Sequence, residues 1–148
     1  MRKRNGFTLV EIITVLVLIA LLMAVLLPSM TAYIRRAREQ SMIVRARAAL
    51  LAAQTLLIER YGTEKWTGET ALTSLLRRAP GRQPGMITAK ELLTLAELSQ
   101  DGVTDIQIGW DEHATVTQFI WVEAAGSGNR SAVWDGISWS VQYETTPG

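Results

Sequence analysis

Residues 6–11 read Gly6-Phe7-Thr8-Leu9-Val10-Glu11, and an apolar run continues from there to Leu27. Apart from Glu11 and two threonines, every side chain between Phe7 and Leu27 is apolar. At about 1.5 Å per helical residue, a run of roughly 21 residues matches the thickness of a hydrocarbon core. The sequence therefore predicts a helix that can span a membrane and that carries one carboxylate near its start.

The net charge of +1 conceals an uneven distribution. Residues 1–61 carry nine Lys or Arg and three Glu, whereas residues 62–148 carry six Lys or Arg and eleven acids. Half of the N-terminal excess comes from Arg2, Lys3 and Arg4, and no nucleic-acid-binding motif accompanies them. The chain has no cysteine, which excludes disulfides, thiolate metal sites and cysteine nucleophiles. We therefore expect no nucleic-acid partner and a domain held together by packing alone.

A helical pattern continues beyond the apolar run. Apolar residues recur at spacings of three and four, which predicts one buried helix face: Ile43, Ala46, Leu50, Ala53, Leu57 and Tyr61. Gly62 is a suitable helix stop. The predicted helix thus runs from about Phe7 to Tyr61 and is on the order of 80 Å long. No single small domain buries such a helix along its whole length, so its first half must lie in lipid or against other subunits.

Pro28 lies inside this predicted helix. Proline lacks an amide hydrogen and its ring crowds the preceding turn, which predicts a kink or a local break near residues 24–28. The pattern leaves open whether Pro28 is a functional hinge or a proline that a membrane helix merely tolerates.

Two short helices are predicted in the middle of the chain. The first covers residues 69–79, and the second opens at the capping box Thr88-Ala89-Lys90-Glu91 and runs through Leu98. Two prolines and two glycines within residues 80–85 predict a loop between them.

The last third is predicted to be β. Strands are expected at 103–110, 116–122, 132–134 and 137–143, with a flexible loop at 126–129 and a hairpin turn at Asp135-Gly136. Alternation of apolar and polar residues from Ile137 to Tyr143 predicts a sheet with one buried face. The expected fold class is α+β, in which the amphipathic second half of a long N-terminal helix packs on a C-terminal antiparallel sheet of three to four strands.

The segment from Gly6 to Glu11 stands behind a basic six-residue leader and ahead of a hydrophobic helix. It resembles the processing and methylation motif of type IV pilins and type II secretion pseudopilins, over about Arg2 to Tyr33. The resemblance implies a pilin-like fold, cleavage after Gly6 by a membrane-embedded prepilin peptidase, and N-methylation of the new Phe7 amine. It also implies assembly into a helical filament with identical or related pilins, driven by an inner-membrane platform protein and an assembly ATPase.

On this resemblance the chain divides into a cytoplasmic leader (1–6), a transmembrane and assembly helix (7–33) and an extracytoplasmic pilin-like domain (34–148). The positive-inside rule alone leaves the orientation open, because basic residues flank the apolar run on both sides. The resemblance places the chain in the cytoplasmic membrane as a single-pass protein in contact with lipid. After assembly it implies a cell-surface filament, or a pseudopilus in the periplasm or cell wall.

Glu11 has a physical argument of its own. Inserting a carboxylate near mid-membrane depth costs roughly 2.5 to 3.5 kcal/mol of free energy. The helix dipole offsets less than about 1 kcal/mol of this cost. A cationic partner is therefore needed, and cleavage would create an α-amino group with a pKa of about 7.7 to 8.0. The resemblance implies that Glu11 pairs with the Phe7 amine of a neighbouring subunit. The alternative is that Glu11 lies at the level of the lipid headgroups.

Other candidate sites are weaker. Asp111-Glu112-His113 is predicted to be a solvated turn, since three consecutive residues cannot converge on one ion. Asp101, Asp105 and Asp135 show no calcium-ligand spacing, so we expect no metal and no cofactor. No nucleophile motif is present, which predicts a structural protein rather than an enzyme. The five tryptophans are expected to pack in the core and sheet, with a binding surface as the alternative.

The primary hypothesis is thus a structural subunit of a type IV pilus-like filament. One alternative is a pseudopilin of a type II secretion or DNA-uptake machine, because these roles share the motif. An alternative of another class is a monomeric, signal-anchored surface domain that binds a ligand through its tryptophan-bearing sheet. A secreted enzyme released by signal peptidase, beginning near Tyr33, is a further alternative.

Overall fold

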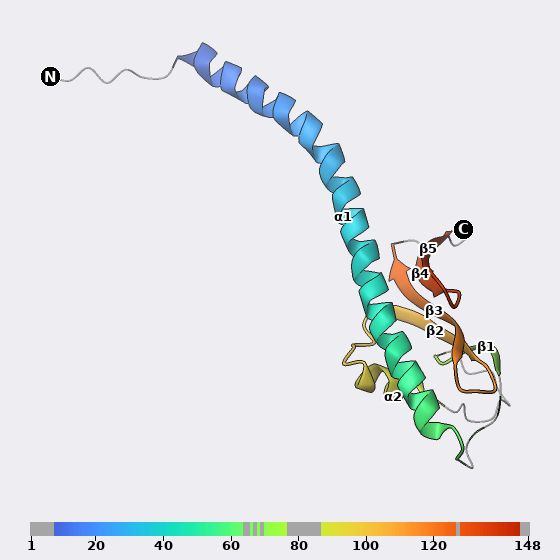
Figure 1. Ribbon diagram of the computed structural model, residues 1–148. Coiled ribbons are helices and arrows are strands. Elements are labelled where there is room, and N and C mark those ends of the chain that lie inside the picture. The colour runs from blue at the N-terminus through green and yellow to red at the C-terminus, as the bar shows by residue number, and fades with distance from the viewer. Residues whose placement is uncertain are drawn as a thin grey trace. The chain divides into compact units, whose positions relative to one another are not determined.

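A computed structural model describes residues 8–63, 66, 68, 70–76, 87–126 and 128–145. The chain divides into two compact units, Met1–Glu39 and Gln40–Gly148, and each is described by itself. Along the chain the described elements are α1 (Leu9–Arg60), β1 (Thr70–Ser74), α2 (Ala89–Leu95), β2 (Val103–Trp110), β3 (Val116–Ala125), β4 (Gly128–Trp134) and β5 (Trp139–Thr145), as labelled in Figure 1.

The long helix is confirmed by α1, which ends one residue before the predicted end at Tyr61. Phe7, where the helix was predicted to begin, lies outside the described residues. The helix assignment continues through Pro28, and the kink expected there stays a prediction.

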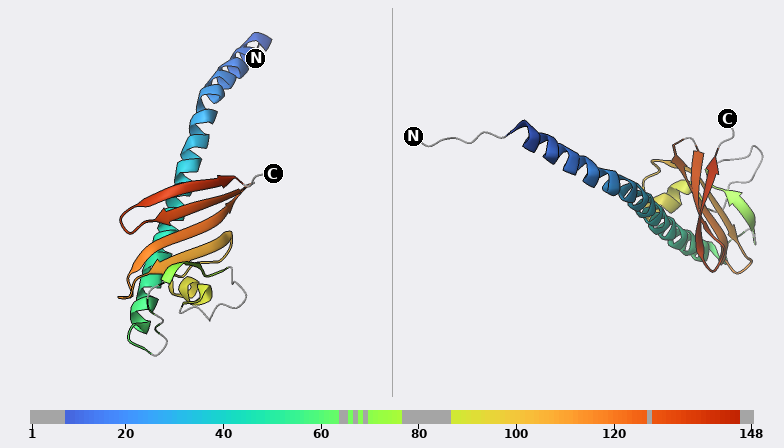
Figure 2. Two further views of the ribbon diagram at one scale, coloured as in Figure 1. Left: turned by 90° about the vertical axis from the view of Figure 1, so that its right-hand side faces the viewer. Right: turned by 90° about the horizontal axis from the view of Figure 1, so that it is seen from above.

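The strands form one antiparallel sheet in the order β1-β2-β3-β4-β5, so that neighbours in the sheet are also neighbours in the sequence. This meander is seen in Figure 2. In its middle, Trp121 of β3 pairs with Ile106 of β2 and with Ala132 of β4. The α+β fold class is therefore confirmed, with one strand more than the three to four expected.

Small residues on the helix meet large residues on the sheet in the core of the second unit. Ala46, Ala49 and Ala53 of α1 are fully buried, as are Phe119 and Trp121 of β3. These residues belong to one buried cluster, in which the large aromatic side chains of the sheet complement the small side chains of the helix. Each buried aromatic side chain removes roughly 150 to 250 Å² from water, worth about 4 to 6 kcal/mol of transfer free energy.

The buried face of α1 differs in part from the predicted one, because some of its positions are shifted by one residue along the sequence. Ala46, Ala53 and Leu57 are buried as predicted, whereas Ile43 and Leu50 are only half-buried. Met42 and Ala49 occupy the core in their place, and Tyr61 is exposed beyond the end of α1. The predicted spacing of three and four residues was right. Because neighbouring positions of this helix are apolar too, more than one face could have been buried, and contact with the sheet determined which one is.

The helix predicted over residues 69–79 is wrong, because Thr70–Ser74 form the edge strand β1. This segment pairs with β2, Ser74 opposite Gln107, and the ladder continues through the bond from Leu75 N to Ile106 O at 2.7 Å. Ser74 Oγ also donates to the Asp105 carboxylate. A short apolar run does not distinguish helix from strand, and here the free edge of β2 decided between them.

The predictions of α2 and of the last hairpin are confirmed, but the end of α2 and the length of the hairpin turn differ from those predicted. The capping box at Thr88 is confirmed, but α2 ends at Leu95 rather than Leu98. The hairpin turn covers residues 135–138, and Ile137 lies in this turn with 93% of its surface exposed instead of in a strand. Asp135 Oδ1 accepts hydrogen bonds from Ile137 N at 3.0 Å and Ser138 N at 2.8 Å, and these fix the longer loop.

The turn between β3 and β4 is shorter than the predicted loop over residues 126–129. Gly128 and Asn129 already belong to β4, and Gly128 pairs with Ala125 across the turn. The second half of the predicted loop, Gly128 and Asn129, is therefore part of strand β4.

The tryptophans are used for packing, as predicted. Two of them are core residues and three pack against the core: Trp110 and Trp121, and then Trp66, Trp134 and Trp139. The indole N–H of Trp110 donates to Gly68 O at 2.7 Å, and the ring of Trp139 lies edge-on to Phe119 with 6.4 Å between centroids. This packing agrees with the prediction that the tryptophans belong to the core and the sheet.

Candidate assembly and processing site

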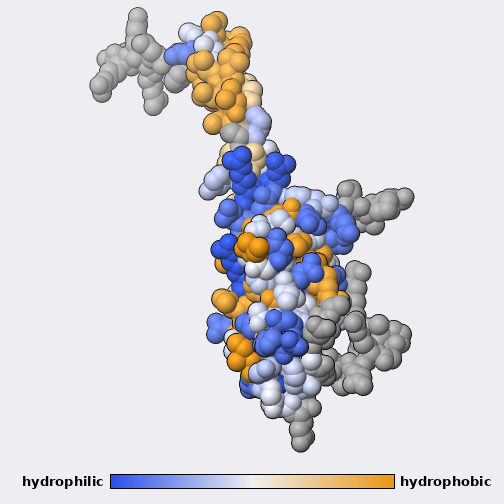
Figure 3. Space-filling model, turned by 45° about the vertical axis from the view of Figure 1, so that its right-hand side comes forward, coloured by the Kyte–Doolittle hydropathy of each residue, from blue (hydrophilic) through white to orange (hydrophobic). Residues whose placement is uncertain are grey.

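The first part of α1 exposes nearly all of its apolar side chains. Figure 3 shows them gathered on the N-terminal part of the helix, and in the sequence they are followed by Arg35, Arg36 and Arg38. Within the described residues one helix, α1, is long and apolar enough to cross a membrane by length and composition, and its apolar window is not buried at all. Such a surface is stable only in lipid or against other protein.

Thr8 and Glu11 form the start of this helix. The backbone N–H of Glu11 donates to Thr8 Oγ1 at 3.3 Å, which makes Thr8 the N-cap and satisfies one of the free amides of the first turn. Thr8-Leu9-Val10-Glu11 has the same S/T-x-x-E form as the capping box at Thr88. The sequence therefore carried a signal for the helix start that was not among the predictions, in which Glu11 was only a charge in an apolar run.

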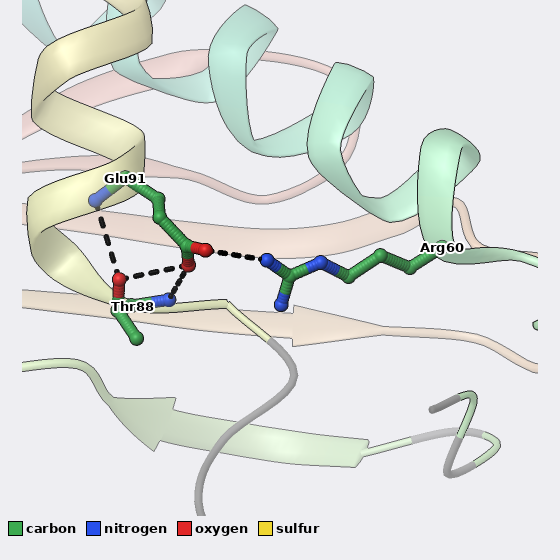
Figure 4. A network of polar contacts seen from close by, with 3 residues as sticks. All are labelled: Arg60, Thr88 and Glu91. Carbon is green, nitrogen blue, oxygen red and sulfur yellow. Dashed lines mark hydrogen bonds and ion pairs between the residues drawn. The ribbon is translucent and has the colours of Figure 1, made fainter. Parts of the chain in front are cut away.

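The capping box at Thr88 shows what a carboxylate does when the box is closed. Glu91 Oε2 accepts from Thr88 N at 3.0 Å and from Thr88 Oγ1 at 2.8 Å, and Glu91 Oε1 accepts from Arg60 Nη2 at 2.6 Å (Figure 4). The hydrogen bond from the Thr88 side chain, followed by that from its backbone and by Arg60, holds the pKa of Glu91 below its usual value.

The Glu11 carboxylate is different. Within the part of the chain that the structure describes, it takes part in no hydrogen bond or ion pair, although its backbone N–H is capped. A carboxylate that is exposed in the first turn of an apolar helix keeps its acceptor positions free for another partner. The Thr8 side chain therefore stabilises the start of the helix through the backbone N–H of Glu11, and the Glu11 carboxylate stays available for another partner.

The remaining residues of the predicted site are placed as follows. Gly6 and Phe7, the predicted cleavage and methylation residues, lie outside the described residues. Pro28 is exposed on α1, and its carbonyl accepts a hydrogen bond from Thr31 Oγ1 at 2.9 Å. Thr14, a polar residue in the apolar run, donates its hydroxyl to Val10 O at 2.8 Å, which is how a helix satisfies such a group in an apolar medium.

The two weaker candidates form local structure. Asp111 Oδ1 accepts from the N–H groups of His113 at 3.0 Å and Thr115 at 2.8 Å, which confirms the predicted turn. Asp105 is buried and accepts hydrogen bonds from Ser74, from its neighbour's backbone and from Gln107. Among the described residues no group of three or more His, Cys, Asp or Glu is arranged to hold a metal ion.

Two contacts between α1 and the sheet had no signal in the sequence. Arg45 Nη2 donates to Glu123 Oε2 at 3.0 Å, and the buried Glu123 also accepts from the Trp121 indole N–H at 2.6 Å. Gln54 donates to Ala114 O at 2.7 Å and accepts from Val116 N at 2.9 Å. Both contacts fasten the helix to the sheet.

Comparison with known families agrees with the geometry of the helix start. Residues 1–27 match the family model described as the prokaryotic N-terminal methylation motif. The chain carries the type IV pilin and pseudopilin signature. This pilin-type signature indicates a structural protein that is processed by prepilin peptidase and assembles with related pilins. Together with the long apolar helix it fits membrane anchoring. No curated protein and no solved structure was found to match the chain.

Proposed function

We propose that this chain is a structural subunit of a type IV pilus-like filament, cleaved after Gly6 and N-methylated at Phe7. The observation that carries the proposal is the Glu11 carboxylate, which lies within the matched motif on an exposed apolar helix and has no partner among the described residues. Removing such a helix from lipid into a polymer requires a cation for Glu11, because an unpaired carboxylate in an apolar medium is costly.

Cleavage after Gly6 would supply that cation as the Phe7 amine. At neutral pH an α-amino group with a pKa of about 7.7 to 8.0 is mostly protonated. A neighbouring subunit would present this amine to Glu11, so that only processed subunits pair. Before assembly the leader would face the cytoplasm and residues 34–148 would lie outside, and a platform protein and an ATPase would drive the transfer from lipid to filament.

Processing is tested by the mass of the membrane-bound protein. The wild type should begin at Phe7 and carry one added methyl group on its amine. Gly6→Leu should leave an unprocessed chain that begins at Met1, because a side chain at this position obstructs the peptidase. Ala20→Leu, a matched change of a small residue deeper in the run, should be processed normally. A wild-type protein with an intact Met1 contradicts the proposal.

Assembly is tested by the charge of Glu11. Glu11→Gln keeps the shape and the capped N–H but removes the charge, so the variant should be processed and should fail to enter sedimenting filaments. Thr14→Val is the control, because the Thr14 hydroxyl donates to Val10 O of its own helix and its loss should leave filament yield near that of the wild type. Wild-type filament yield from Glu11→Gln would refute the pairing.

A pseudopilin of a secretion or DNA-uptake machine is the second candidate, because the matched motif is shared by both kinds of protein. Imaging separates them: a pilus subunit should give long surface filaments, whereas deletion of a pseudopilin should abolish secretion or DNA uptake without loss of a surface filament. The monomeric binding domain has less support, since the tryptophans that would have formed its surface pack in or against the core.

A further inference from the structure

Beyond its apolar part, α1 carries three arginines close together within the first unit. Arg35, Arg36 and Arg38 are all exposed, and none of them forms an ion pair with another residue that the structure describes. With three arginines and one glutamate, the segment 33–39 has a net charge of +2. Figure 3 shows the apolar side chains of the helix giving way to hydrophilic ones. This charge therefore needs a partner outside the described part of the chain.

Together with Tyr33, the three arginines surround the helix instead of forming one stripe. Successive residues of an α-helix lie about 100° apart around its axis. Arg36 and Arg38 therefore point about 100° and about 300° from Arg35, and Tyr33, which is 74% exposed, points about 160° from it. We call these four residues the basic collar. A stripe suits a single protein partner, whereas a helix that crosses a bilayer meets lipid headgroups on all sides.

The basic collar also has the height and the chemistry of a headgroup layer. From Tyr33 to Arg38 the helix rises by about 7.5 Å, and the headgroup layer of one leaflet is roughly 5 to 7.5 Å thick. Tyrosine is enriched at this level because its ring is apolar and its hydroxyl is polar. A guanidinium group matches a phosphate with two parallel hydrogen bonds. Both residue types thus fit a layer of lipid phosphates.

We propose that the basic collar binds the phosphates of anionic lipids in the outer leaflet before the subunit assembles. The inference rests on the proposed function, which places the apolar run across the membrane with residues 34–148 outside. Cleavage would remove the three basic residues of the leader, and no Lys or Arg lies between Phe7 and Ile34. The first basic side chains of the processed chain would then lie outside, contrary to the usual positive-inside bias. Anionic headgroups are the partner that balances them.

This binding also sets the depth of Glu11. Because α1 is helical from Leu9 to Arg60, Glu11 and Arg35 are separated by about 36 Å along its axis. A tilt of about 20° leaves about 34 Å along the membrane normal, which exceeds the hydrocarbon thickness of about 30 Å. With Arg35 among the outer phosphates, Glu11 lies in the headgroup layer of the inner leaflet. Its carboxylate then leaves water only on assembly, when the Phe7 amine of a neighbouring subunit becomes available.

The lipid that stays bound to the purified full chain tests the basic collar. In detergent micelles with equal amounts of phosphatidylglycerol and phosphatidylcholine at low salt, native mass spectrometry should show the wild type retaining mainly phosphatidylglycerol. Replacing the collar arginines together (Arg35→Gln, Arg36→Gln and Arg38→Gln) should lower the ratio of the two lipids at least about fivefold, the effect of roughly one arginine near an anionic surface. Arg47→Gln, also exposed on α1, is the matched control and should leave the ratio unchanged.

Two results would overturn the lipid as the ligand. One is equal retention of the two lipids by the wild type, or an equal loss of phosphatidylglycerol from the triple variant and from Arg47→Gln. The other is release of phosphatidylglycerol by inorganic phosphate but not by chloride at the same ionic strength, because the ligand is then a free anion.

Cysteine reactivity tests the depth of Glu11, since the chain has no cysteine of its own. In phosphatidylglycerol vesicles with a water-soluble maleimide on both sides, processed Leu9→Cys should react at least about tenfold faster than Leu18→Cys, because the hydrocarbon core excludes the reagent. Leu9 and Leu18 are 78% and 55% exposed on α1, so the folded chain itself shields neither of them. Equal protection of the two cysteines would place Glu11 in the hydrocarbon core and overturn the inferred depth.

The outcomes separate the inference from the proposed function. A processed wild type that forms filaments but retains both lipids equally overturns the basic collar and leaves the proposed function standing. A wild type that keeps Met1 contradicts the proposed function, and the inferred depth of Glu11 falls with it.

Discussion

Replacing Gln54 with leucine should destabilise the second unit far more than an exposed surface change does. The Gln54 amide bridges α1 and the turn between β2 and β3: its NH₂ donates to Ala114 O at 2.7 Å and its oxygen accepts from Val116 N at 2.9 Å. Ala114 and Val116 are buried, with 1% and 2% of their surface exposed. Leucine fills a similar volume but leaves both backbone groups without these partners.

The magnitude follows from the two orphaned groups. A buried donor or acceptor that loses its partner costs about 1 to 3 kcal/mol, and the apolar leucine side chain recovers part of this by burial. We therefore expect the free energy of unfolding to fall by about 2 to 4 kcal/mol. With a urea m value of about 1.5 kcal/mol per M, the unfolding midpoint should fall by roughly 1.3 to 2.7 M.

The assay is urea unfolding of the full chain in detergent micelles, followed by tryptophan fluorescence. Gln40→Leu is the matched control: it makes the same replacement at an exposed position of the same helix and should change the free energy by no more than about 0.5 kcal/mol. A Gln54→Leu variant that unfolds at the same urea concentration as Gln40→Leu would refute the view that this amide fastens the helix to the sheet.

Three further predictions concern the contacts around α2 and β3. Thr88→Ala removes the N-cap of α2 and should cost about 1 kcal/mol, with amide exchange accelerated in α2; unchanged exchange in α2 would contradict the cap. Because Thr88 and Arg60 lower the pKa of Glu91 in the folded chain, its stabilising contribution is present above the ordinary pKa of 4.5 and is lost as the pH falls through the lowered value. Glu91→Gln should therefore make unfolding free energy less dependent on pH in this acid range, and an acid limb identical to that of the wild type would argue against it. Trp121→Phe removes the 2.6 Å hydrogen bond to Glu123 and part of a fully buried side chain, so it should cost about 2 to 4 kcal/mol in the urea assay, and a loss below 1 kcal/mol would be inconsistent with this packing.

Local patterns predicted local structure well. The S/T-x-x-E pattern at Thr88 identified the start of α2, and its side-chain and backbone partners lie within three residues of one another. The same pattern at Thr8 was available and was overlooked, although the bond that it predicts from the Glu11 N–H is present. Asp135 and Gly136 located the last hairpin, but the length of its turn depended on where the Asp135 side chain found donors.

Where the local sequence has no strong preference for helix or strand, contacts with neighbouring elements of the fold determine the secondary structure. Leu72, Leu75 and Leu76 have a spacing that suits a helix, whereas the threonines of Thr70–Ser74 suit a strand, and pairing with the edge of β2 made this segment β1. The rotation of the buried face of α1 has a similar cause, because several faces of an alanine- and leucine-rich helix are apolar and only contact with the sheet distinguishes them.

The sequence by itself determined the processing motif, the long helix and the α+β class, because each depends on the order and spacing of residues close together in the chain. Tertiary structure alone decided which helix face is buried, which contacts fasten it and which face stays open. The Arg45–Glu123 pair joins residues 78 positions apart, and the bond between Gln54 and Val116 N spans 62. Such contacts depend on how two finished surfaces fit, and no local pattern encodes that fit.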